Sequence, residues 1–180
     1  MRLKAEETMA VVIDYQEKLM PVINENDAVT ANSAILIKGL RELEVPIIVS
    51  QQYTKGLGET IEPIKEALGD FTPMEKKTFS LMDTEEIKEK ITGYGKKNVV
   101  VCGTEAHICV LQTVIDLREA GYNVFLVTDC IGSRKNSDKK ASIKRAMAEG
   151  AFICTYESVL YELTAGAGSP HFKAISKLTK

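Results

Sequence analysis

With 180 residues, the chain is long enough to bury the core of one domain, and we expect a single domain over residues 1–180. Its hydrophobic content of 44% and charged content of 27% are ordinary for a water-soluble globular protein. The formal net charge of −2 gives no electrostatic case for binding nucleic acid or an anionic membrane.

The four cysteines lie apart at positions 102, 109, 130 and 154, with no C-x-x-C pair. This spacing favours a reduced, intracellular protein over a disulfide framework. The charged N-terminus lacks the apolar core of a signal peptide, and no apolar run approaches the length of a membrane span. We therefore expect a cytoplasmic protein that does not interact with membranes.

Strand-like apolar runs alternate with helix-like segments along the whole chain. In chain order we expect a strand at 8–14, a helix at 27–43, a strand at 45–50, helices at 60–68 and 84–92, a strand at 99–101, a helix between Thr104 and Gly121, a strand at 123–128, a helix at 137–149, a strand at 151–155, and helical pieces at 157–165 and 170–179. The strands are apolar without polar alternation, which is typical of strands buried on both faces. The pattern predicts a three-layer, doubly wound α/β fold with a mostly parallel sheet covered by helices on both faces.

In such a fold the carboxyl ends of different strands meet at one crevice. Asp14 ends the first strand, and Cys109 lies in the first turns of the helix after the central strand. A helix start lowers a thiol pKa and offers free N–H groups. Lys77 is expected to reach the crevice from the segment between them. The plain alternatives are a buried structural cysteine, a strand-end aspartate that caps a turn and a solvated lysine.

Together these three side chains make chemical sense. Asp14 would take the thiol proton of Cys109 and later return it to a leaving group, as general base and then acid. Lys77 would keep the local charge positive and orient the carboxylate. Backbone N–H groups at the helix start would bind the oxyanion of an acyl-transfer intermediate.

Three motifs occur in the order and spacing of the isochorismatase-like cysteine hydrolases, which the chain resembles over nearly its whole length. They are Val-Val-Ile-Asp-Tyr-Gln at 11–16, Lys-Thr-Phe-Ser at 77–80 and Gly-Thr-Glu-Ala-His-Ile-Cys-Val-Leu-Gln-Thr at 103–113. The resemblance is greatest to the small isochorismatase-domain proteins, and it implies that Asp14, Lys77 and Cys109 form a catalytic triad. It also implies a cis peptide bond at Thr104–Glu105, which would aim the Glu105 N–H, beside that of Cys109, at the oxyanion.

One departure from that family limits which of its properties can be expected of this chain. Nicotinamidases of the family hold a metal through an Asp-x-His pair and a further His, whereas this chain has Gln51, Gln52 and Tyr53 in that region. Its two histidines, His107 and His171, are too few and too far apart to suggest a metal site. We therefore expect no catalytic metal and no other cofactor, and nicotinamide becomes a less favoured substrate.

The favoured function is hydrolysis of a small molecule through a covalent Cys109 adduct, with cleavage of an amide or related C–N bond through a thioester. Two alternatives stay open: vinyl-ether hydrolysis of an isochorismate-type acid, which needs proton donation by Asp14, and a catalytically silent scaffold or binding protein of the same fold. A homo-oligomer is expected from the resemblance. The candidate pocket residues are Gln16, Gln51, Tyr53, Phe79 and His107.

Overall fold

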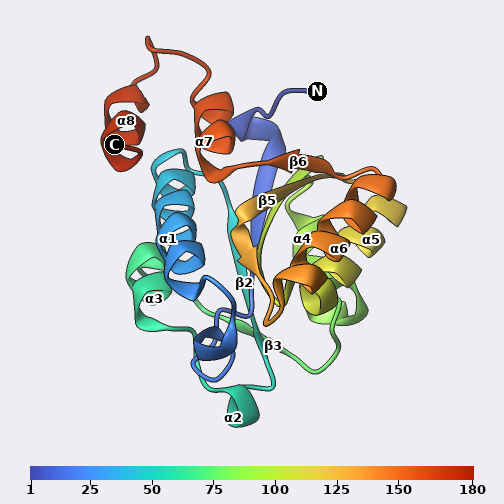
Figure 1. Cartoon of the computed structure of the whole chain (residues 1–180). Coiled ribbons are helices and arrows are strands. Elements are labelled where there is room, and N and C mark those ends of the chain that lie inside the picture. The colour runs from blue at the N-terminus through green and yellow to red at the C-terminus, as the bar shows by residue number, and fades with distance from the viewer.

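Six parallel strands form one sheet in the computed structural model, which describes residues 1–180 (Figure 1). The strands are β1 (Thr8–Ile13), β2 (Ile47–Gln52), β3 (Met74–Lys76), β4 (Asn98–Thr104), β5 (Asn123–Gly132) and β6 (Phe152–Cys154). They lie in the order β3-β2-β1-β4-β5-β6, and every neighbouring pair is parallel. The predicted α/β fold is confirmed, and the sheet is parallel throughout.

Helices cover both faces of this sheet (Figure 1). They are α1 (Asn26–Glu42), α2 (Thr54–Leu57), α3 (Glu62–Leu68), α4 (Glu85–Gly93), α5 (Leu111–Glu119), α6 (Asn136–Ala148), α7 (Tyr156–Thr164) and α8 (Phe172–Leu178). Short 3-10 turns occupy Ala5–Glu7, Met20–Val22 and Leu81–Asp83, and a π-helical turn occupies Ala106–Val110. Helices α1, α3, α7 and α8 pack on one face, and α4, α5 and α6 pack on the other.

Strand β1 shows why its sequence has no polar alternation. Ala10 and Val12 belong to the core beneath α1, whereas Met9, Val11 and Ile13 belong to the core beneath α4 and α5. All five side chains are buried because each face of the strand has its own layer of helices. No helix of the chain has the length and hydrophobicity to cross a lipid bilayer.

Three expectations need correction. Residues 74–76 form an edge strand that no apolar pattern announced, since it is three residues long and contains Glu75 and Lys76. Strand β5 continues to Gly132 rather than ending at residue 128. Strand β2 spans Ile47–Gln52 rather than residues 45–50, and the single helical turn α2 follows it at Thr54–Leu57.

The strand order creates a switch point between β1 and β4. From β1 the chain proceeds outward to β2 and β3, and from β4 it proceeds outward to β5 and β6 on the other side. Ligands of open α/β sheets bind at the carboxyl ends of the strands beside such a point. Gly103 allows the two strand ends to approach, because a Cβ there would lie 2.3 Å from the carbonyl oxygen of Ile13.

Candidate active site

Asp14 directly follows β1 at this switch point, in a left-handed backbone conformation with φ 52°. Its side chain is fully buried. The Oδ1 atom accepts a hydrogen bond of 2.7 Å from the Ser50 hydroxyl, and Oδ2 accepts one of 2.7 Å from the Lys76 ammonium. Thr104 donates to the backbone carbonyl of Asp14 over 2.7 Å, which ties the end of β1 to the end of β4.

Lys76 supplies the positive charge next to Asp14. Its side chain has 0% solvent exposure, and its Nζ donates to Asp14, to Gln52 Oε1 over 2.6 Å and to the Thr78 carbonyl over 3.3 Å. An ammonium has three N–H donors, so all of them are used. A buried charge is tolerated when it is paired and fully hydrogen-bonded, and this lysine meets both conditions.

The prediction of Lys77 for this position is wrong. Side chains alternate between the two sides of a strand, so Lys76 enters the crevice and Lys77 is exposed to solvent. The same register places Gln52, rather than Gln51, opposite Lys76 and therefore in the crevice. Gln52 holds the ammonium with its oxygen and donates from Nε2 to the Lys77 carbonyl over 2.9 Å.

Cys109 lies in the π-helical turn Ala106–Val110, just before α5, and is 6% exposed. The pKa of its thiol is raised to about 12, first by burial and then by the Asp14 carboxylate, while the Lys76 ammonium opposes the rise. The sequence had suggested that the helix start and a lysine would favour the thiolate. Burial and Asp14 outweigh these influences, so the resting thiol is protonated and needs a base.

The peptide bond between Thr104 and Glu105 is cis, as the family resemblance implied. The Glu105 carbonyl accepts hydrogen bonds from the N–H groups of Ile108 and Val110, whereas the Glu105 N–H donates to no backbone carbonyl. The buried Glu105 carboxylate is bound by Arg134, whose Nε lies 3.1 Å from both oxygens. Arg134 was not predicted, because nothing in the sequence links two residues that are 29 positions apart.

Two of the predicted pocket residues have their side-chain amides engaged elsewhere. Gln16 is buried, accepts from the Gln52 N–H and donates to the carbonyls of Gln52 and Gly58, so it holds two loops together and offers a substrate nothing. Gln51 donates to Thr54 and accepts from Thr60. It lines a separate cavity of about 440 Å³ beyond the edge of the sheet. The prediction of both as substrate ligands therefore needs correction.

The other three candidates remain available at the surface. Tyr53 follows β2 and Phe79 follows β3, and their exposures of 46% and 51% are high for aromatic side chains. His107 lies two residues before Cys109, and its Nδ1 is 2.9 Å from the hydroxyl of the buried Ser133. Its Nε2 lies 3.9 Å from Asp138, so the ring is fixed between two elements.

The three central groups are largely shielded from solvent. Neither Asp14 nor Lys76 has exposed side-chain surface, so a substrate approaches from the side of Cys109. Four of the surface cavities, with volumes of about 570, 440, 520 and 400 Å³, are lined by other residues. No group of three or more His, Cys, Asp or Glu side chains is placed to hold a metal ion.

Comparison with known proteins identifies the family. The family model described as the isochorismatase domain matches residues 8–158. Isochorismatase domain-containing protein 2 from Danio rerio is 37% identical over 178 residues, which cover 98% of this chain and 89% of that protein.

Solved structures of similar proteins share the fold. One described as the MAR1 ribonuclease from Caenorhabditis elegans is 37% identical, with a TM-score of 0.92 and coverage of 99% of this chain and 92% of that chain. The YcaC gene product of Escherichia coli, described as an octameric hydrolase of unknown specificity, has a TM-score of 0.93 at 22% identity, over 98% and 88% of the two chains. The extent of the family match and of these similarities confirms the resemblance, and the chain belongs to the isochorismatase family of hydrolases.

Proposed function

We propose that the chain hydrolyses an amide or related C–N bond of a small molecule by nucleophilic catalysis at Cys109, without a metal ion. One observation carries this proposal: a buried carboxylate, held by Lys76 and Ser50 at 2.7 Å each, lies close enough to the Cys109 thiol to raise its pKa. A protonated thiol beside a fixed base is the arrangement that nucleophilic attack requires.

In the first step the Asp14 carboxylate takes the thiol proton as the Cys109 sulfur attacks the carbonyl carbon of the substrate. A C–S bond forms, and the carbonyl oxygen becomes an oxyanion. The free N–H of Glu105 and the N–H of Cys109 are the proposed donors to that oxygen. Collapse of the tetrahedral intermediate breaks the C–N bond, and Asp14 returns the proton to the departing amine.

In the second step Asp14 takes a proton from water as the water oxygen attacks the thioester carbonyl. The C–S bond then breaks, the proton passes to the Cys109 sulfur, and the carboxylic acid leaves. Lys76 offsets the negative charge that Asp14 places beside the reacting sulfur, and it keeps the carboxylate oriented through both steps.

Two alternative reactions are tested alongside amide hydrolysis. Vinyl-ether hydrolysis of an isochorismate-type acid fits the family name and requires only proton donation by Asp14. Cleavage of RNA is favoured by the description of the similar Caenorhabditis elegans protein as a ribonuclease. The burial of Asp14 and Lys76 weighs against RNA cleavage. A phosphodiester within a polymer would have to reach catalytic side chains that have no exposed surface.

The test is turnover of a panel of small amides, ureas, esters, a vinyl ether and a short RNA by the wild type, Cys109→Ala and the matched control Cys154→Ala. The proposal predicts hydrolysis of an amide, urea or ester, with an acyl mass on the intact protein that Cys109→Ala alone loses. If Cys109→Ala still cleaves the vinyl ether or the RNA, that reaction would replace amide hydrolysis as the proposed function. A chain that turns over no compound of the panel and forms no acyl adduct with any of them would favour the scaffold.

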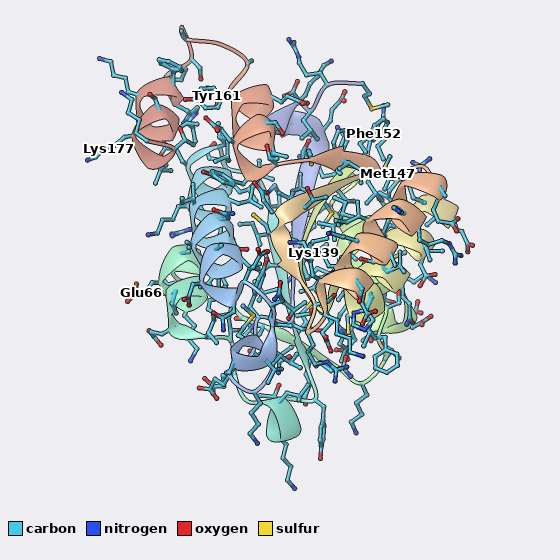
Figure 2. The ribbon with its side chains drawn as sticks, viewed as in Figure 1. Glu66, Lys139, Met147, Phe152, Tyr161 and Lys177 are labelled. Atoms are coloured by element: carbon cyan, nitrogen blue, oxygen red, sulfur yellow. The ribbon has the colours of Figure 1, made fainter.

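The proposal extends to assembly and location. A homo-oligomer is supported by the exposed apolar side chains Met147, Phe152 and Ile153 around the free edge of β6 (Figure 2). An unguarded edge strand readily pairs with another chain. A reducing, cytoplasmic setting is supported by four cysteines that are all free.

A further inference from the structure

Positive charge is concentrated in residues 134–145, which we call the basic segment. It contains six cationic side chains and one carboxylate, Asp138, whereas the whole chain has 23 Lys and Arg residues against 25 Asp and Glu residues. The six are Arg134, Lys135, Lys139, Lys140, Lys144 and Arg145. Only the two arginines form ion pairs, Arg134 with Glu105 and Arg145 with Glu149, so none of the four lysines is in contact with a carboxylate.

The start of the basic segment adjoins the turn that contains Cys109. Arg134 contacts Glu105 at 3.1 Å, and Asp138 lies 3.9 Å from His107. Since α6 begins after β5 at the carboxyl edge of the sheet, Lys135, which caps the helix, and Lys139, in its first turns, lie near the same edge as Cys109. The amino end of this 13-residue helix adds partial positive charge there.

Such an arrangement acts on charged ligands before they bind. Charges of one sign beside a crevice raise the local concentration and association rate of oppositely charged molecules by about 10- to 1000-fold. Three carboxylates oppose the field. Glu105 is neutralised by Arg134, which leaves Asp138 and Asp129, whose charge acts on Lys139, against the four lysines. The site itself contributes a paired Asp14 and Lys76, so the field of the basic segment is not cancelled locally.

We propose that the natural substrate of this hydrolase is a small anion, drawn to Cys109 by the basic segment, with Lys135 and Lys139 as the main contributors. This inference rests on the proposed function, because it names the charge of the molecule that the cysteine attacks. A neutral substrate would gain nothing from the field, and a polyanion would gain from it without fitting the shielded site.

Alkylation of Cys109 tests the field without a known substrate. Iodoacetate is an anion and iodoacetamide is its neutral analogue, so the ratio of their rate constants at Cys109 reports the local potential. The variants are Lys135→Glu/Lys139→Glu and the control Lys173→Glu/Lys177→Glu, which changes the net charge equally. The control pair lies on α8, over the face of the sheet opposite to α6 (Figure 2).

The ratio is expected to fall about threefold or more in Lys135→Glu/Lys139→Glu and to stay near the wild-type value in the control. It should also fall for the wild type between about 20 mM and about 300 mM salt, as screening shortens the range of the field. Any change in the thiolate fraction affects both reagents equally and cancels in the ratio. Circular dichroism and urea denaturation check that each variant is folded.

The outcomes separate the two proposals. Equal ratios in all three proteins, with normal iodoacetamide rates, would overturn the anionic substrate and leave the cysteine hydrolase intact. Turnover of a panel compound that persists in Cys109→Ala would overturn the proposed function and this inference with it. Protection of Cys109 by a short RNA, but not by a small dicarboxylate such as succinate, would replace the small anion by a nucleic acid.

Discussion

The Lys76 ammonium lies 2.7 Å from the Asp14 carboxylate, and both side chains are fully shielded from solvent. Removing one partner of a buried pair leaves an uncompensated charge, at a cost of about 3–5 kcal/mol. We therefore expect Lys76→Ala to lower the free energy of unfolding by that amount, as measured by urea denaturation. Lys77→Ala, at the exposed neighbouring position, should change it by no more than about 0.5 kcal/mol. Equal losses in the two variants would contradict the pairing.

Asp14→Asn should separate thiol reactivity from catalysis. The Asp14 carboxylate raises the pKa of the Cys109 thiol and Lys76 lowers it, so the substitution removes the opposing charge and lets the pKa fall. More thiolate is then present near neutral pH. Alkylation by iodoacetamide is expected to become faster than in the wild type, by about tenfold for each unit of the pKa change. Amide hydrolysis should nevertheless be lost, because the base is gone.

Slower alkylation of Asp14→Asn would show that the carboxylate activates the resting thiol rather than suppressing its ionisation. Asp14→Glu is the companion variant, since it keeps the charge but moves it by one methylene. It should keep the slow alkylation of the wild type, which distinguishes loss of the charge from general loosening of the site.

Stability should decline in alkaline solution. The pKa values of Cys102, Cys109 and Cys154 are each raised to about 12, in each case first by burial, whereas an unfolded thiol has a pKa of about 8.5. The unfolded state therefore releases these protons first, and the stabilising contribution is lost as the pH rises from about 9 to about 12. Each thiol removes about 1.4 kcal/mol per pH unit within that window.

Urea denaturation at a series of alkaline pH values measures this slope. Cys102 is the most informative site, because it is completely buried and takes no part in the proposed reaction. Cys102→Ala should reduce the slope of the unfolding free energy against pH by the contribution of one thiol. The cavity that the substitution leaves should lower the unfolding free energy by an amount that does not depend on pH. An unchanged slope would mean that the thiol does not ionise on unfolding in this range.

Gly103 tests the close approach of β1 and β4. Its φ of 141° is unfavourable for other residues, and a Cβ would lie 2.3 Å from the Ile13 carbonyl oxygen. Gly103→Ala should therefore destabilise the protein by about 3 kcal/mol or more and disturb the spacing of Asp14 and Cys109. Gly95→Ala is the matched control, because Gly95 also has a positive φ of 62° but open space around it. It should cost only about 1 kcal/mol.

Much of the fold could be predicted from the sequence because the signals were local. The unbroken apolar runs at Met9–Ile13 and Val99–Val101 indicated strands buried on both faces, and the alternation with helices indicated a parallel sheet. Asp14 was identified because it directly follows such a run, and Cys109 because it lies in the first turns of the helix after one, at the edge where chemistry is expected.

The features that were missed depend on register or on distant pairing. Choosing Lys76 over Lys77, or Gln52 over Gln51, requires the side-chain alternation of β2 and of the three-residue strand β3, which has no apolar period of its own. The ion pair between Glu105 and Arg134 joins the ends of two strands and leaves no local trace. The thiol pKa was misjudged because burial, unlike helix position, cannot be read from neighbouring residues.

The most direct test of the proposed mechanism is acid-quench peptide mapping of the wild type during turnover of an amide or ester identified from the panel. We predict an acyl group on the peptide that contains Cys109, which appears and decays at rates that account for turnover and is absent in Cys109→Ala. An acyl group on any other residue, or turnover that proceeds without an acyl-enzyme and persists in Cys109→Ala, would contradict the assignment of Cys109 as the nucleophile.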